Sequence, residues 1–161
     1  SLLINILGGQ AFNSRLNLSV REKYGLSYSV DAYYNAYVDN GYYSINFSSD
    51  NGNTQKILEV VHRELKKLRE TKIGSLQLHN AKRQIIGQTA VYLDSQANDL
   101  ISAGKTFMHT SQIPDFNQLR EMIENISSEE LQDVANEIMQ ADKLSYLCFN
   151  SKSNYRRFGR L

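Results

Sequence analysis

The chain has 161 residues, of which 41% are hydrophobic and 22% charged, and these values fit one globular domain and argue against a disordered or coiled-coil protein. Its formal net charge of +1 gives no electrostatic footprint for nucleic acid. The single cysteine, Cys148, excludes an internal disulfide and a cysteine-based zinc site. No apolar stretch approaches the roughly 18 residues of a membrane span. Neutral charge and a lone cysteine favour a reducing compartment such as the cytoplasm.

The first elements are predicted to be helices. Apolar residues within 2–8 recur at helical spacing and Gly8 stops that helix. No basic segment precedes them and no cleavage site follows, so we expect a chain that begins inside a fold, as a fragment does. Asn13 or Ser14 can cap a second helix, which Gly25 closes. The helices predicted along the whole chain cover 2–8, 13–23, 54–71, 75–93, 95–109, 116–126 and 127–140.

A β-hairpin gives the strongest strand signal. Apolar and polar residues alternate over 26–38 and again over 42–49, and Asp39-Asn-Gly41 between them is typical of a tight turn. A short strand is predicted at 143–149. This order indicates an α+β two-layer sandwich, with a mostly antiparallel sheet and helices packed on one face. Three strands are few for such a sheet, so we expect that a leading strand before Ser1 is missing.

The domain organisation predicted from these elements is a single domain over 1–150. Residues 151–161 form a basic tail that we expect to be solvated and partly disordered.

No self-sufficient active site is visible in the sequence. Neither H-E-x-x-H nor H-x-x-E-H occurs, and there is no G-x-S-x-G or phosphate-loop pattern. The three histidines, His62, His79 and His109, fall on separate predicted helices without a ligand pattern, and we interpret them as ordinary surface or half-buried residues. We therefore expect no metal-binding and no cofactor-binding residue in this chain.

One run of residues does resemble a known family. It comprises Leu7-Gly-Gly9, then Ser14-Arg-Leu16, then Arg21-Glu-Lys-Tyr-Gly-Leu-Ser-Tyr28. The run is similar to the second-repeat (C-terminal, non-zinc) domain of the insulinase, pitrilysin and mitochondrial-processing-peptidase family of inverted-motif zinc metallopeptidases. Gln10 departs from that pattern, where a third glycine is frequent.

The resemblance implies a function that needs a second repeat. In such enzymes two halves close like a clam shell around an unfolded peptide, and one repeat holds zinc through H-x-x-E-H. The facing repeat offers an Arg and a Tyr to the substrate carbonyl, and Arg21 and Tyr28 occupy those positions. The implied partners are a zinc-bearing repeat of the same protein or of a partner subunit, in a homodimer or heterodimer, and an unfolded peptide substrate. We expect this chain to be inactive alone. We also expect that it does not bind nucleic acid and does not span a membrane.

Other interpretations of the same residues stay open. Arg21 could simply complement the dipole of the helix that ends near it. The ring of Tyr28 shares its parity with the apolar strand positions, so it could belong to the core. The whole domain could also be a non-catalytic peptide-binding or assembly module of an inactive family member, adding an extended peptide at a sheet edge. The many strand tyrosines would suit such a surface, although ordinary strand propensity explains them equally well.

Overall fold

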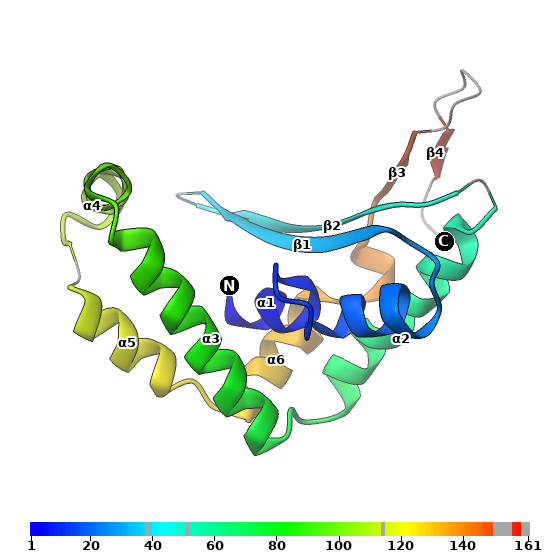
Figure 1. Ribbon diagram of the computed structural model, residues 1–161, viewed down its shortest axis with the longest axis horizontal. Coiled ribbons are helices and arrows are strands. Elements are labelled where there is room, and N and C mark those ends of the chain that lie inside the picture. The colour runs from blue at the N-terminus through cyan, green and yellow to red at the C-terminus, as the bar shows by residue number, and fades with distance from the viewer. Residues whose placement is uncertain (38, 51, 114, 150–155, 159–161) are drawn as a thin grey trace.

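The computed structural model describes residues 1–37, 39–50, 52–113, 115–149 and 156–158 (Figure 1). Its helices are α1 (Leu2–Gly8), η1 (Asn17–Lys23), α2 (Thr54–Glu70), α3 (Ser75–Leu93), α4 (Gln96–Thr110), α5 (Phe116–Glu124), α6 (Ser128–Ile138) and η2 (Ala141–Lys143). Its strands are β1 (Ser29–Ala36), β2 (Gly41–Ser48), β3 (Tyr146–Cys148) and β4 (Arg156–Phe158). The predicted helices are confirmed to within a few residues. None of the helices in the described part is long and apolar enough to cross a membrane.

The predicted hairpin is confirmed. Strands β1 and β2 pair antiparallel from Ser29 opposite Ser48 to Ala36 opposite Gly41, and the Tyr37 amide donates to the Asn40 carbonyl at 2.8 Å across the turn. β1 is shorter than predicted, because it begins at residue 29 rather than 26. The preceding residues are held by the helix instead of the sheet, as the site description below shows.

The hairpin and the helices form two layers. In Figure 1 the β1–β2 hairpin lies over α1, η1, α2 and α6, while α3, α4 and α5 form an arm to one side. This arrangement confirms the α+β architecture. The last predicted strand, however, does not join the hairpin: β3 pairs antiparallel with β4 in a separate two-stranded sheet. Strand β4, Arg156–Phe158, falls in the tail for which partial disorder is predicted; the rest of 151–161 lies outside the described residues, so partial disorder of the tail stays a prediction.

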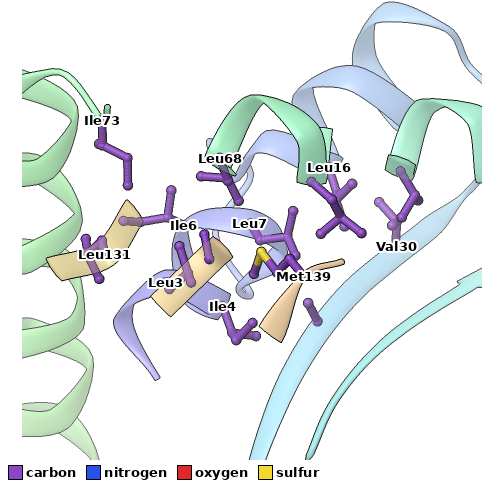
Figure 2. Close-up of a cluster of buried hydrophobic side chains, with 14 of the residues drawn as sticks. Leu3, Ile4, Ile6, Leu7, Leu16, Val30, Leu68, Ile73, Leu131 and Met139 are labelled. Atoms are coloured by element: carbon purple, nitrogen blue, oxygen red, sulfur yellow. The ribbon is translucent and has the colours of Figure 1, made fainter. Parts of the chain in front are cut away.

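The core lies where α1, η1, β1, α2 and α6 meet, as Figure 2 shows. The largest side chains with almost no exposure are Leu7, Leu16, Val20, Ile57, Leu65, Leu68 and Met139. α1 approaches β1 closely at Gly8, where an added Cβ atom would lie 2.8 Å from Cβ of Ala32. This cluster fixes the positions of η1 and of the connection that leads from η1 to β1.

Candidate functional site

The two predicted site residues lie on η1 and on the connection that leads from η1 to β1. Residues 17–23 are wound as a π-helix and not as the α-helix that the sequence predicts. The Tyr24 amide donates to the carbonyl of Ser19, five residues back, at 3.2 Å. Wider turns of this kind occur often at functional sites. Arg21 lies in the last turn of this segment.

A tight backbone reversal joins the π-helix to the strand. Gly25 has φ +57°, a left-handed conformation that glycine adopts without strain, and its amide donates to the Arg21 carbonyl at 3.0 Å. The next amide, of Leu26, donates to the Val20 carbonyl at 3.0 Å. Because Leu26 is tied back to the helix in this way, it is not available to the sheet ladder, and β1 starts three residues later.

The side chain of Arg21 is partly exposed and faces an aromatic ring. Its Cζ atom lies 5.0 Å from the centroid of the Phe12 ring, and 40% of the side chain is accessible. Its Nε atom is 3.7 Å from a carboxylate oxygen of Glu22, which is too long for a hydrogen bond. The guanidinium donors of Arg21 are therefore accessible to a ligand, and its position in the last helical turn also suits the helix dipole.

Tyr28 projects into solvent. It is 82% exposed and lies in the bend just before β1, so the interpretation of its ring as part of the core is wrong. The residue that sequence reasoning missed here is Ser27. Only 7% of Ser27 is exposed, and its hydroxyl lies 2.6 Å from the carbonyl oxygen of Ser48 on β2. This hydrogen bond fixes the backbone next to Tyr28 to strand β2. The side chain of Tyr28 is therefore exposed, but the backbone that carries it is fixed.

The structure thus brings Arg21 and Tyr28 to the two ends of one short reversal around Gly25. Within the part of the chain that the structure describes, no hydrogen bond or ring contact joins them to each other. Both present donors outward, a guanidinium and a phenol hydroxyl. Such a pair can hydrogen-bond an oxygen that carries negative charge.

A cationic hollow on the other side of η1 was not predicted from the sequence. It measures about 380 Å³ and is lined by the cationic residues Arg15, Lys23, Arg63 and Lys67 together with Glu64 and Gln77, among others. Glu64 is only 6% exposed, and Lys67 satisfies its carboxylate at 2.8 Å. Burial lowers the pKa of Arg15, and the charge of Glu64 opposes that shift. The spacing of Arg63 and Lys67 along α2 was the available signal, but their approach to η1 is a tertiary contact.

A second, larger hollow is a groove between β2 and the segment 143–149. Its volume is about 1360 Å³, and α2 and α6 contribute Leu58, Val61 and Ile138 to its lining. Tyr43 of β2 also lines it. The Tyr43 hydroxyl is buried without a hydrogen-bond partner among the described residues, and burial raises the pKa of Tyr43 to about 12. β2 pairs with β1 on one edge, and its other edge borders this groove.

Metal ligands do not gather in the described part of the chain. No three His, Cys, Asp or Glu side chains there are placed to hold an ion. His62 is half-buried, and its Nε2 atom lies 2.7 Å from the Tyr146 hydroxyl, so it ties α2 to β3. His79 is exposed, and the side chain of His109 lies outside the described residues.

Comparisons with known proteins show the family of the chain. Residues 1–85, just over half the chain, match the family model described as the peptidase M16 inactive domain. An uncharacterized zinc protease of Bacillus subtilis is 28% identical over 141 residues, which cover 88% of this chain and 34% of the relative. The alpha subunit of the mitochondrial-processing peptidase of Rattus norvegicus is 24% identical over 134 residues, covering 82% of this chain and 25% of that subunit.

Solved structures show the same fold. A crystal structure of a peptidase M16 inactive domain from Pseudomonas fluorescens superposes with a TM-score of 0.75 at 23% identity, over 85% of this chain and 32% of that one. The chain spans about a third or less of the length of the curated relatives it matches. With these matches, the resemblance inferred from the Leu-Gly-Gly, Ser-Arg-Leu and Arg-Glu-Lys run is confirmed. The chain therefore belongs to the M16 family of zinc metallopeptidases, which includes the processing peptidases, and it is the inactive, non-zinc domain of that family.

Proposed function

We propose that this domain is the non-zinc half of a zinc metallopeptidase and closes a peptide-degrading chamber against a zinc-bearing repeat. In this role Arg21 and Tyr28 donate hydrogen bonds to the scissile carbonyl of an unfolded peptide. The observation that carries the proposal is the η1–β1 reversal, which exposes both donors on a rigid segment. Relatives that are named zinc proteases, with this chain matching a third of their length, support a zinc site elsewhere in the full-length protein.

The chemistry explains why these two residue types suit the role. Zinc bound by the other repeat would activate water for attack on the carbonyl carbon. As the attack proceeds, negative charge builds on the carbonyl oxygen. A guanidinium, as at Arg21, offers several N–H donors in one plane, and the hydroxyl of Tyr28 adds an O–H donor. Donors that are fixed before the reaction stabilise this charge without reorganisation.

The partners follow from the same proposal. The zinc-bearing repeat belongs either to the same polypeptide or to a partner subunit, and we expect the full-length protein to form a homodimer or a heterodimer. The substrate is an unfolded peptide because the carbonyl must reach donors on one surface and the metal on the facing one.

The test is zinc-dependent hydrolysis of a quenched, unfolded peptide by the full-length protein. We expect Arg21→Ala to reduce turnover about a hundredfold with zinc content unchanged, since loss of one fixed donor costs about 10²–10³. Tyr28→Phe, which removes only the hydroxyl, should also reduce turnover. Arg83→Ala and Tyr92→Phe are matched controls, because they alter exposed side chains of the same types on α3. Unchanged turnover in Arg21→Ala would refute the donor role.

A second candidate function is favoured by the groove beside β2. Among the described residues β2 pairs with β1 alone, and the groove beside it has apolar residues in its lining; backbone groups at a strand edge and pockets for side chains are what strand addition of an extended peptide uses. Full-length protein that binds the peptide without cutting it would support this non-catalytic role. Binding by the 161-residue chain but not by the full-length protein would mean that a strand of the longer polypeptide already fills the groove. No saturable binding by either at millimolar peptide would exclude the role.

A further inference from the structure

Phe12 is a large apolar side chain in a place where burial does not explain it. The ring is 69% exposed, so it contributes little to the core. Single exposed apolar residues are common on proteins and need no role by themselves. Two features distinguish Phe12: the hydrogen-bonded turn that carries it and the charged group that lies over its ring.

The segment that carries Phe12 is a tight turn between α1 and η1. The Ser14 amide donates to the Ala11 carbonyl at 3.0 Å, which places Phe12 at the second position of a four-residue turn. Ser14 is only 3% exposed, and its hydroxyl accepts a hydrogen bond from the Asn17 side chain at 2.9 Å. The backbone that carries the ring is thus anchored to η1, the same segment that carries Arg21.

The charged group is the guanidinium of Arg21, with its Cζ atom 5.0 Å from the ring centroid. This distance is within the range in which an aromatic face attracts a cation. The alternative partner, the carboxylate of Glu22, lies 3.7 Å away and is itself exposed. The Glu22 carboxylate and the Phe12 ring would affect the N–H donors of Arg21 differently. A carboxylate would accept hydrogen bonds from these donors, whereas a ring face attracts the cation and accepts none of them.

We propose that Phe12 is a positioning residue for Arg21, and this inference rests on the donor role of Arg21 proposed above. The ring holds the guanidinium at a position where its Nε atom is too far from Glu22 for a hydrogen bond, and it keeps the N–H groups available for the substrate carbonyl. A flexible arginine without the ring spends part of its time paired with Glu22 or extended in water. The consequence is a smaller fraction of enzyme molecules with a fixed donor, which reduces turnover more than peptide binding.

The kinetic test compares Phe12 variants of the full-length protein, with the quenched peptide as substrate. Phe12→Leu keeps an apolar side chain but removes the ring, and we expect kcat to fall about two- to fivefold, as for loss of one exposed cation–π contact, with KM changed by less than about twofold. Phe12→Tyr restores the ring and should restore kcat. In the Arg21→Met background, Phe12→Leu should have no further effect, because the ring then has no cation to hold.

Tyr24→Leu is the matched control. Tyr24 also carries a guanidinium over its ring, that of Arg63 at 5.2 Å, but neither residue has a proposed part in the reaction. We expect kcat of this variant to stay within about twofold of the wild type. An equal loss from Phe12→Leu with and without Arg21 would show that Phe12 acts on its own and would overturn the inference.

A spectroscopic measurement separates the inference from the proposed function. In the wild-type protein the ring current of Phe12 should shift the Arg21 Hδ and Hε resonances upfield, and Phe12→Leu should return them toward random-coil values. Unchanged resonances overturn the inference whatever the activity. Shifted resonances together with an Arg21→Ala variant of full activity mean that the contact exists and that the donor role has failed.

Discussion

Two glycine-to-alanine substitutions in helices should change stability in opposite directions. At Gly87, in α3, an added Cβ atom meets nothing within 4 Å. The substitution there changes only the backbone conformational entropy that is lost on folding. Alanine at such a position is favoured by about 0.5–1 kcal/mol, because glycine loses more conformational freedom on folding. We therefore expect Gly87→Ala to raise the melting temperature by about 1–4 °C, using about 2–4 °C per kcal/mol for a protein of this size.

At Gly8, the last residue of α1, the same change meets the strand. The new Cβ atom would lie 2.8 Å from Cβ of Ala32, 3.0 Å from its backbone nitrogen and 3.2 Å from a methyl group of Leu16. A strand backbone cannot give way as a flexible side chain can, so α1 must shift from β1. Overpacking of this kind costs about 1–3 kcal/mol, which exceeds the gain from the backbone term. With the middle of each range, the net expectation is a loss of about 1 kcal/mol, or about 2–4 °C in melting temperature.

The assay is reversible thermal or urea unfolding of the purified protein, followed by circular dichroism. The double variant Gly8→Ala/Ala32→Gly removes the nearest contact and should recover part of the loss, which identifies the α1–β1 approach as its cause. If Gly8→Ala were as stable as Gly87→Ala, α1 and β1 would not lie as close as described. The Leu-Gly-Gly run would then need another explanation than this approach.

Three further outcomes are expected. Tyr28→Phe should leave the free energy of unfolding unchanged within about 0.5 kcal/mol, because an exposed hydroxyl has no buried partner to lose; a larger loss would indicate a structural role for Tyr28. Ser127→Ala removes the N-cap of α6, whose side chain accepts from the Glu130 amide, and should cost about 1 kcal/mol in urea unfolding; no change would mean that the helix end is satisfied by water. The Ser127 backbone N–H and then its hydroxyl hold the pKa of Glu130 below its ordinary value of 4.5, so this stabilisation is complete above pH 4.5 and disappears as the pH falls through the lower folded value. The difference in free energy of unfolding between Glu130→Ala and wild type should accordingly become smaller as the pH falls from 7 through the folded pKa, and a difference that does not change with pH would contradict this lowered pKa.

Several structural features were predictable from short stretches of sequence. The period of α2, the capping box at Ser127 and the turn before Gly41 each depend on residues within about four positions of one another. The candidate site came from a resemblance instead, since Arg21 and Tyr28 stand in a run that is similar to the family's pattern. Local patterns also indicated the α+β class, because hairpin and helices follow in an order that few architectures accommodate.

What the sequence by itself determined is therefore the family to which the chain belongs and the kind of most elements, with the π-helical winding of η1 and strand β4 as exceptions. The tertiary structure decided where the elements stop and what their side chains meet. Strand alternation suggested that β1 starts at residue 26, but the hydrogen bond from Leu26 to Val20 keeps that segment on the helix and leaves Tyr28 in solvent. Likewise β3 pairs with β4 rather than with the hairpin, and the ring of Phe12 reaches Arg21 only because one turn is anchored on η1. The physical reason is that these choices depend on contacts between residues that sequence spacing does not bring together, whereas propensity and periodicity act within a single turn or strand.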